Sequence, residues 1–334
     1  MAEFVYKDAK VWMDQFDISG FLNSVTVNHG IEPGDNTAMG DNVRSAMPGL
    51  DTLSFEHSAF VEFGDNLIEQ IVQNRMGPNV DSGLLTIDVV AAAKTFTRTD
   101  ATGSFIKDGF RVGQNVTTSG FTNGGNNGVK KILTVTDLVI TMTVTTGLVN
   151  ESGGGNEQIV RTEATEVPMT IGPQTGLEGE RAVFFEAVNV STKFGGAVGT
   201  APAPMTFSGQ ASGSKQIVHG TIMEDGAVAR TVTGAQSPDL QLGAVTAAQK
   251  LYGIFHLLAF SGWVSIDIEL ESSATGAFAG EETPRLSFTN ATAIGAEYAT
   301  PVSGAITDTW WRATWTFNGA GPGSATFVVA MGIR

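Results

Sequence analysis

The chain has 334 residues, more than a single hydrophobic core usually organises, so two or more domains are expected. Its net charge is −15, and its lysines and arginines form no cluster that could neutralise a nucleic-acid backbone, which argues against tight nucleic-acid binding. Cysteine is absent, which excludes disulfides and thiolate metal sites. Abundant glycine, with threonine and valine in alternating runs, predicts a mainly β protein.

The first segment, residues 1–82, alternates in polarity as β-strands do. Two strand patterns, at 22–29 and 53–60, flank a polar, Gly-rich segment from residue 30 to residue 49. This segment, here called the arm, is too long for a tight hairpin turn and too hydrophilic to be buried, so we expect it to project and to contact neighbouring molecules. The residues predicted to make these contacts are Glu32, Asp35, Asp41 and Arg44.

One α-helix is predicted, at residues 66–76. Asn66 can cap its start with Glu69 as the capping-box partner, an apolar stripe follows, and Gly77-Pro78 ends the run. A short amphipathic helix has to cover an apolar sheet face, so we expect it to pack on the strands that flank it.

Three further parts follow in the chain. Residues 83–164 are predicted to form a small β domain inserted in a loop, because their charge is balanced and Gly-rich tracts bound them. The second half of the core is expected at residues 165–237, with strands at 182–193 and 205–210. Alternating runs over residues 238–334 predict a C-terminal β-sandwich.

The residue types that could support catalysis form no recognisable active-site motif in the sequence. The four histidines lie in no zinc-binding spacing, and no nucleophile motif is present, so we predict no catalytic residue, no metal, no cofactor and no enzymatic activity. His57 is expected to be a polar sheet residue and His256 a satisfied core residue. Acidic pairs such as Glu224-Asp225 are interpreted as turn residues, with calcium binding there left as an alternative.

A tryptophan-rich run near the C-terminus has two interpretations. Alternation sends Trp311 and Trp315 to one face, which is typical of core packing. The neighbouring Trp310 is expected to be exposed and is the best candidate for a saccharide platform. Contact of the outer domains with a host-surface saccharide is therefore an alternative role. The N-terminus lacks a signal-peptide pattern and no apolar run is long enough to span a membrane, so a soluble, unexported chain without membrane contact is expected.

Two motifs connect the first segment to a known family. They are Asp17-Ile18-Ser19-Gly20-Phe21-Leu22-Asn23-Ser24-Val25 and Pro48-Gly49-Leu50-Asp51-Thr52-Leu53. With them the chain resembles the major tail tube proteins of long-tailed (siphovirus-type) bacteriophages. The segments at 103–136 and 242–312 resemble an add-on β domain of phage structural proteins and a C-terminal domain of some tail tube proteins, respectively.

The resemblance implies a tail-tube β-sandwich or barrel core with one packed α-helix. It implies a virion protein, assembled in the host cytoplasm, that polymerises as stacked hexameric rings into a channel for DNA. The implied partners are further copies of the chain and the tail terminator, tape measure and distal tail proteins, with DNA passing transiently and without tight binding. Another virion role, as a capsid decoration or distal tail protein, and a carbohydrate-binding β-sandwich remain as alternatives.

Alternation along four core strands sorts their side chains into two sets. The apolar set is Val25, Val27, Leu53, Phe55, Val188, Val190, Met205 and Phe207. The polar set is Ser24, Thr26, Asn28, Ser54, Glu56, Ser58, Asn189, Ser191, Lys193, Thr206, Ser208 and Gln210. In a tube the polar set is expected to face the lumen, because a wall with few cations does not hold DNA. An ordinary solvent-exposed sheet face is the other interpretation.

Overall fold

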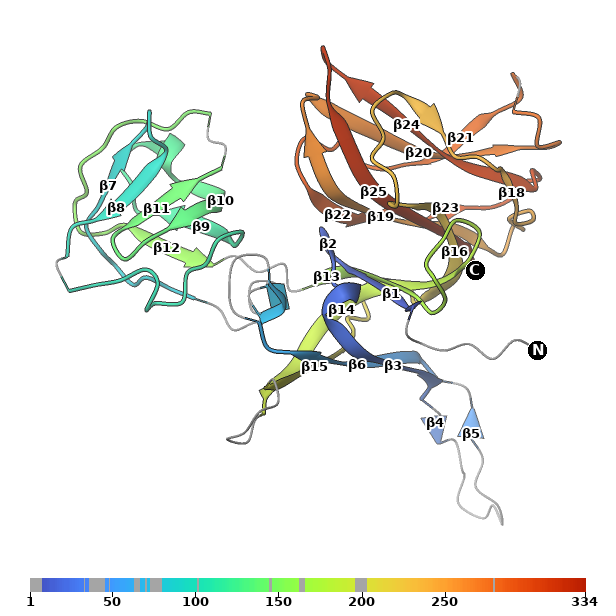
Figure 1. Ribbon diagram of the computed structural model, residues 1–334, viewed down its shortest axis with the longest axis horizontal. Helices are drawn as coiled ribbons and strands as arrows, with labels where there is room; N and C mark the ends of the chain where they lie inside the picture. Colours follow the sequence, from blue (N-terminus) through green and yellow to red (C-terminus); the bar gives the residue numbers. More distant parts are fainter. Residues whose placement is uncertain are drawn as a thin grey trace. The chain divides into compact units, whose positions relative to one another are not determined.

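A computed structural model describes residues 8–32, 34–35, 46–47, 49–62, 67–69, 71–72, 80–100, 102–143, 146–161, 166–195, 203–278 and 280–334. The chain divides into two compact units. Unit 1 comprises Met1–Phe60 with Val167–Arg334, and unit 2 comprises Val61–Glu166. Both consist mainly of antiparallel strands (Figure 1), which confirms the predicted mainly β class.

Unit 1 contains one large branched sheet, one five-stranded sheet and the short pair β4 and β5. Its strands are β1 (Lys10–Met13), β2 (Phe16–Asp17), β3 (Leu22–Ile31), β4 (Gly34–Asp35), β5 (Ala46–Met47), β6 (Asp51–Phe60), β13 (Val167–Gly172), β14 (Arg181–Phe194), β15 (Pro204–Ala211), β16 (Val218–Asp225), β17 (Gly234–Ala235), β18 (Leu240–Gln241), β19 (Lys250–Ser261), β20 (Ser265–Ser273), β21 (Thr283–Ser287), β22 (Gly295–Tyr298), β23 (Val302–Ser303), β24 (Trp310–Asn318) and β25 (Ser324–Ile333).

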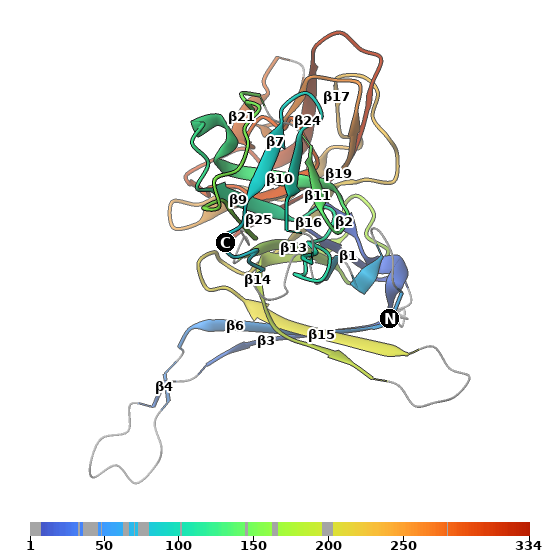
Figure 2. The ribbon, with the colours of Figure 1, turned by 90° about the vertical axis from the view of Figure 1, so that its left-hand side faces the viewer.

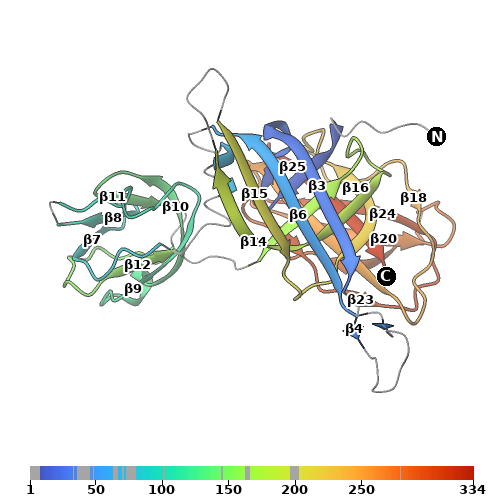
Figure 3. The ribbon, with the colours of Figure 1, turned by 90° about the horizontal axis from the view of Figure 1, so that it is seen from below.

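The large sheet branches at β14. Residues 181–187 of β14 pair with β13 and β16, whereas residues 187–194 pair with β15. From there the order continues through β15 and β6 to β3, all antiparallel. We call this branch, β3-β6-β15-β14, the four-strand sheet; Figure 3 shows its strands side by side from below. The short pair β4 and β5 continues the β3–β6 hairpin beyond one end of the sheet (Figure 2).

The first family motif builds the entry to β3. The Ser19 backbone N–H donates to the Asp17 carboxylate at 3.0 Å, and the Ser19 hydroxyl accepts from the N–H of Val11 at 2.8 Å. These bonds fix a 3₁₀ turn, Ser19–Phe21, between β2 and β3. The Asp-x-Ser spacing therefore has a local structural role in starting the four-strand sheet.

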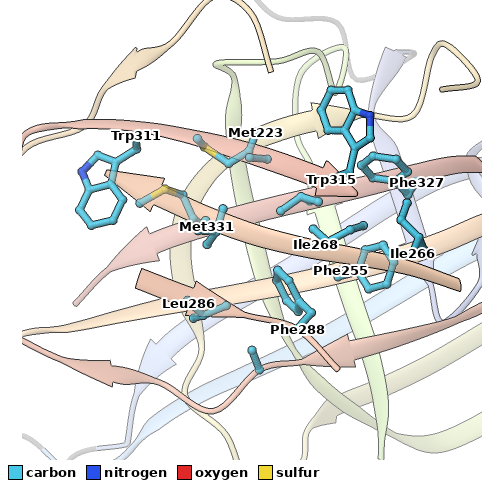
Figure 4. Packing of buried hydrophobic residues seen from close by; sticks show 14 of the residues in the cluster. Met223, Phe255, Ile266, Ile268, Leu286, Phe288, Trp311, Trp315, Phe327 and Met331 are labelled. Atoms are coloured by element: carbon cyan, nitrogen blue, oxygen red, sulfur yellow. The ribbon is translucent and has the colours of Figure 1, made fainter. Parts of the chain in front are cut away.

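The C-terminal part of unit 1 has its own core. There β24 pairs with β20, and β25 pairs with β19 and β16. Large side chains from these strands pack together (Figure 4), among them Phe255, Trp311, Trp315 and Phe327. Because β16 joins β14 to β25, the large sheet continues across the predicted boundary at residues 237 and 238.

Unit 2 is a six-stranded sheet with the order β12-β9-β10-β11-β8-β7. Its elements are β7 (Ile87–Val90), β8 (Thr95–Arg98), β9 (Asn115–Ser119), a 3₁₀ turn (Gly124–Asn126), β10 (Gly128–Val135), β11 (Val139–Met142) and β12 (Gln158–Arg161). The sheet encloses phenylalanines such as Phe96, Phe105 and Phe110. The predicted inserted domain, residues 83–164, falls within this unit.

The predicted helix is seen in part. Residues 68, 69, 71 and 72 are helical, and the N–H of Ile71 donates to the carbonyl of Leu67 at 3.0 Å. Ile68, Ile71 and Val72 are buried, as the apolar stripe predicts. The rest of the predicted span, including Asn66, lies outside the described residues. Among the helical segments that are described, none has the length and apolar character needed to cross a membrane.

Candidate assembly surface

Eleven of the twelve residues of the predicted polar set lie together on one face of the four-strand sheet. Cross-strand pairing arranges them in three rows. The first row is Ser24, Ser58, Thr206 and Lys193; the second is Thr26, Glu56, Ser208 and Ser191; the third is Asn28, Ser54 and Gln210. All of them are exposed or half-buried. We call this surface the polar face.

The opposite face of the same sheet is buried. Leu53 and Phe55 of β6, and Met205 and Phe207 of β15, are at most 2% exposed. Each is next to a residue of the polar face along its strand, because successive side chains of a strand point to opposite faces. The sheet therefore has one face covered by its own chain and one open polar face.

Asn189 does not join the rows because β14 contains a bulge. The register shifts between Asn189 and Ser191, so Asn189 pairs with Gly209 and Val188 pairs with Gln210. Strict alternation along β14 had predicted the reverse, with Val188 in the apolar set. One additional residue in a bulge reverses which side chains face each side of the sheet beyond the bulge. The sequence pattern does not reveal the bulge. The side chains of Asn189 and Val190 lie outside the described part of the structure.

The polar face carries little charge. Glu56 is its carboxylate and Lys193 its ammonium group, and the other members of the three rows are hydroxyls and amides. The hydroxyls of Ser191 and Ser208 lie 3.0 Å apart and link β14 to β15. Lys193 lies one residue before the end of β14, at the margin of the face. This surface offers water many hydrogen bonds and a phosphate few points of attachment.

Both lateral edges of the four-strand sheet are open in the described residues. On one side β3 pairs only with β6, and on the other, residues 188–194 of β14 pair only with β15. The edge of a sheet is a template for strand addition. Because the sheet has four antiparallel strands, its two edge strands run in opposite directions.

His57 is a correction to the sequence analysis. It lies on the buried face, is fully buried, and packs against the rings of Phe55 and Phe207 at centroid distances of 5.2 Å. Burial lowers its pKa to about 4, so the ring is neutral at neutral pH. The signal was present in the sequence, since His57 shares the alternation of Leu53 and Phe55.

His256 is a satisfied core residue, as predicted. It is fully buried, with Nδ1 at 2.7 Å from the carbonyl of Asp14 and Nε2 at 2.8 Å from the hydroxyl of Thr170. A carbonyl can only accept, so Nδ1 carries the proton and Nε2 accepts from Thr170. Burial lowers the pKa of His256 to about 4.

The base of the arm is anchored on unit 1. The N–H of Glu32 donates to the carbonyl of Leu50 at 3.0 Å, and Asp51 forms an ion pair with Arg334. His29 Nδ1 lies 2.7 Å from His219 Nε2. Of the predicted contact residues, Glu32 is exposed. The side chain of Asp35 and the whole of Asp41 and Arg44 lie outside the described residues, so the contact role of the arm stays a prediction.

Glu224, which is buried, and Asp225, which is half-buried, belong to an ionic cluster. Together with Glu178 they place three carboxylates within 4.8 Å of one another. Arg230 Nη2 lies 2.7 Å from Glu224 and 3.5 Å from Glu178, so a guanidinium group already compensates part of this charge. Burial, with the neighbouring carboxylates, raises the pKa of Glu178 to about 7. The cluster forms an ion network with Arg230, and its three carboxylates are spaced as metal ligands could be, so the calcium alternative stays a prediction.

The tryptophan run matches the core-packing interpretation. Trp311 and Trp315 are buried in the C-terminal core. Trp310 is half-buried, and the backbone of Gly276 lies against its indole, since a Cβ on Gly276 would come within 2.7 Å of the ring. The expected exposed platform is therefore partly covered, and saccharide binding there stays a prediction.

Comparisons with known proteins give little information about this chain. No family model matches the chain, and no curated protein matches it by sequence. Among solved structures, it is similar to the crystal structure of the Dit protein of phage SPP1, described as a hub of the adsorption apparatus in phages that infect Gram-positive bacteria. That likeness has 9% identity and a TM-score of 0.28, over 98% of this chain and 99% of the other. A similarity this low carries no argument about function.

Proposed function

We propose that this protein is a structural component of a bacteriophage tail that polymerises into the tail tube, the channel through which DNA passes. The observation that carries the proposal is the four-strand sheet, with one polar face and two open edges that run in opposite directions. When β3 of one copy pairs with β14 of the next, the antiparallel alternation continues. Repetition around a ring closes the sheet into a barrel and removes its edges.

The polar face then becomes the wall of the channel. Each copy contributes one Glu56 and one Lys193 among hydroxyls and amides. Every cation that reaches a phosphate adds attraction through counterion release, which must be broken for DNA to move on. A wall with one cation and one carboxylate per copy favours passage over binding. The buried face, with Phe55, His57 and Phe207, points into the body of each subunit.

Other elements of the proposal rest on the resemblance of the two motifs to tail tube proteins. These are the hexameric symmetry, the stacking of rings, the tail terminator, tape measure and distal tail partners, and the location in the virion. The arm contributes ring-to-ring contacts, and no catalytic group or cofactor takes part. The open edges of β3 and β14 support self-assembly independently of this resemblance.

Electron microscopy of the purified protein tests the proposal. The ten residues of β6 span about 34 Å at 3.4 Å per residue, so stacked rings with an axial repeat of about 40 Å or less are expected. Discrete particles would favour another virion role, such as a distal tail or capsid decoration protein. A monomer whose edges stay unpaired at high concentration would contradict self-assembly altogether.

A further inference from the structure

The exposed apolar side chains of the four-strand sheet gather at the two ends of its strands. At the end that carries the arm, Ile31 is 57% exposed and Leu50 is 81% exposed. At the opposite end, Phe60 is 45% exposed and Phe194 is 52% exposed. Between them lie the three polar rows. Large apolar groups that are exposed at both strand ends, beyond the three polar rows, indicate end-to-end contact with another molecule.

The arm end is hollow and has an exposed carboxylate. A cavity of about 480 Å³ opens there, lined by Leu50, Glu32, Asp51 and Lys215 among others. Asp51 in its wall already pairs with Arg334, and Lys215 lies over the ring of Tyr298 at 5.6 Å. Glu32 is exposed beside Leu50, to which it is joined by a backbone hydrogen bond. This end therefore presents an apolar side chain next to a carboxylate.

The opposite end presents the complementary pair. Phe194 is the last residue of β14, and Lys193 precedes it; both are exposed, Lys193 on the polar face and Phe194 on the opposite side of the strand end. One end of the sheet thus presents an aromatic ring and an ammonium group. The other end presents an apolar side chain and a carboxylate beside the cavity, which match them in polarity and charge. Such opposite surfaces on one chain suit a heterologous, head-to-tail contact, which propagates because each copy leaves both surfaces available to the next.

We propose that copies of this chain stack along the strand direction with Phe194 and Lys193 of one copy seated against Leu50 and Glu32 of the next. The inference rests on the proposed tube function and names its axial contact, in addition to the arm. Stacking of this kind also aligns the polar rows of successive copies into one continuous wall. The occupant of the cavity is a second copy of the same chain.

Charge exchange tests the contact. Lys193→Glu and Glu32→Lys each place like charges together, and each should raise the protein concentration needed for tube formation at low salt by about tenfold. The double variant restores opposite charges and should return this concentration to within about twofold of the unmodified protein. Sedimentation of tubes measures the effect, and added salt should reduce it for the single variants. Lys107→Glu, an exposed change in unit 2, is the matched control and should leave polymerisation unchanged.

The outcomes separate the two proposals. If the unmodified protein forms tubes but the double variant fails to recover, or the single variants polymerise normally, the axial contact is wrong and the tube function stands. If the unmodified protein forms no polymer under any condition, both are overturned. Phe194→Ser gives a second measurement: it should weaken tube formation while leaving the thermal unfolding of the monomer unchanged, because the ring is exposed.

Discussion

The four-strand sheet and the C-terminal core of unit 1 are both antiparallel, yet they differ in how their faces and edges are covered. In the C-terminal core, β20 and β24 face β19 and β25, and rings such as Trp311 and Phe327 fill the space between the two layers. In the four-strand sheet, one face is covered and the other is polar, and both edges are open in the described residues. One region fills the space between two layers with its own side chains, whereas the other leaves a polar face and two long edges that suit pairing with other copies.

The largest expected effect is on the free energy of unfolding, when a phenylalanine is changed to alanine in each of the two regions. Phe327 is 1% exposed and packs against Trp315 at a centroid distance of 5.5 Å, so Phe327→Ala should lower the free energy of unfolding by about 3–5 kcal/mol. Phe194→Ala, on a half-exposed ring of β14, should cost under about 1 kcal/mol. Denaturant unfolding of the monomer measures both. Equal losses would mean that the end of the four-strand sheet is stabilised internally, against the comparison.

The two buried histidines give the next effect. His256→Leu removes the partners of the Thr170 hydroxyl and the Asp14 carbonyl and should cost about 2 kcal/mol at pH 7. His57→Leu, on a ring that packs against Phe55 and Phe207, should be within about 1 kcal/mol of neutral. Denaturant titrations at pH 7 rank the two. A larger loss for His57→Leu would show that its ring nitrogens make contacts essential to the four-strand sheet.

These histidines also predict a pH dependence. Both have folded pKa values lowered to about 4, below the ordinary 6.5, so the unfolded chain binds more protons between these values. The stability that they contribute is present above pH 6.5 and is lost as the pH falls toward 4. The free energy of unfolding of each leucine variant should therefore fall less steeply with decreasing pH than that of the unmodified protein over this window. An unchanged slope in His57→Leu would contradict its neutral, buried state.

A smaller effect of opposite sign comes from Glu178. Its folded pKa is raised to about 7, so the folded chain binds more protons than the unfolded chain between pH 4.5 and 7, and its contribution is lost as the pH rises through that range. The free energy of unfolding of Glu178→Gln minus that of the unmodified protein should therefore be about 1 kcal/mol larger at pH 8 than at pH 5. Comparing the two proteins at each pH cancels the histidine contribution. A constant difference would mean that Arg230 already neutralises the cluster.

The sequence predicted the two-residue alternation well and its interruptions poorly. Strong alternation along β3, β6 and β15 was enough to group the polar face, because one buried face fixes the register of a strand. The bulge in β14 left no pattern in the sequence, so alternation alone did not give the pairing of Val188 with Gln210 and of Asn189 with Gly209. His57 was misjudged by residue type although its position matched the buried set. The covering of Trp310 by Gly276 depends on a contact between the start of β24 and the bend that follows its partner strand β20, which periodicity does not encode.

The smallest expected effect on stability is on the polar face, and it tests what that face does. Glu56→Lys with Ser54→Arg changes exposed side chains of β6 and should alter the free energy of unfolding by less than about 0.5 kcal/mol. In assembled tails the added cations would line the channel, so DNA ejection should slow, and salt should restore it because counterion release weakens as ionic strength rises. Glu56→Gln removes charge without adding a cation and serves as the control. Normal ejection by tails carrying the double variant would mean that this face does not line the channel, however well the sheet is built for pairing.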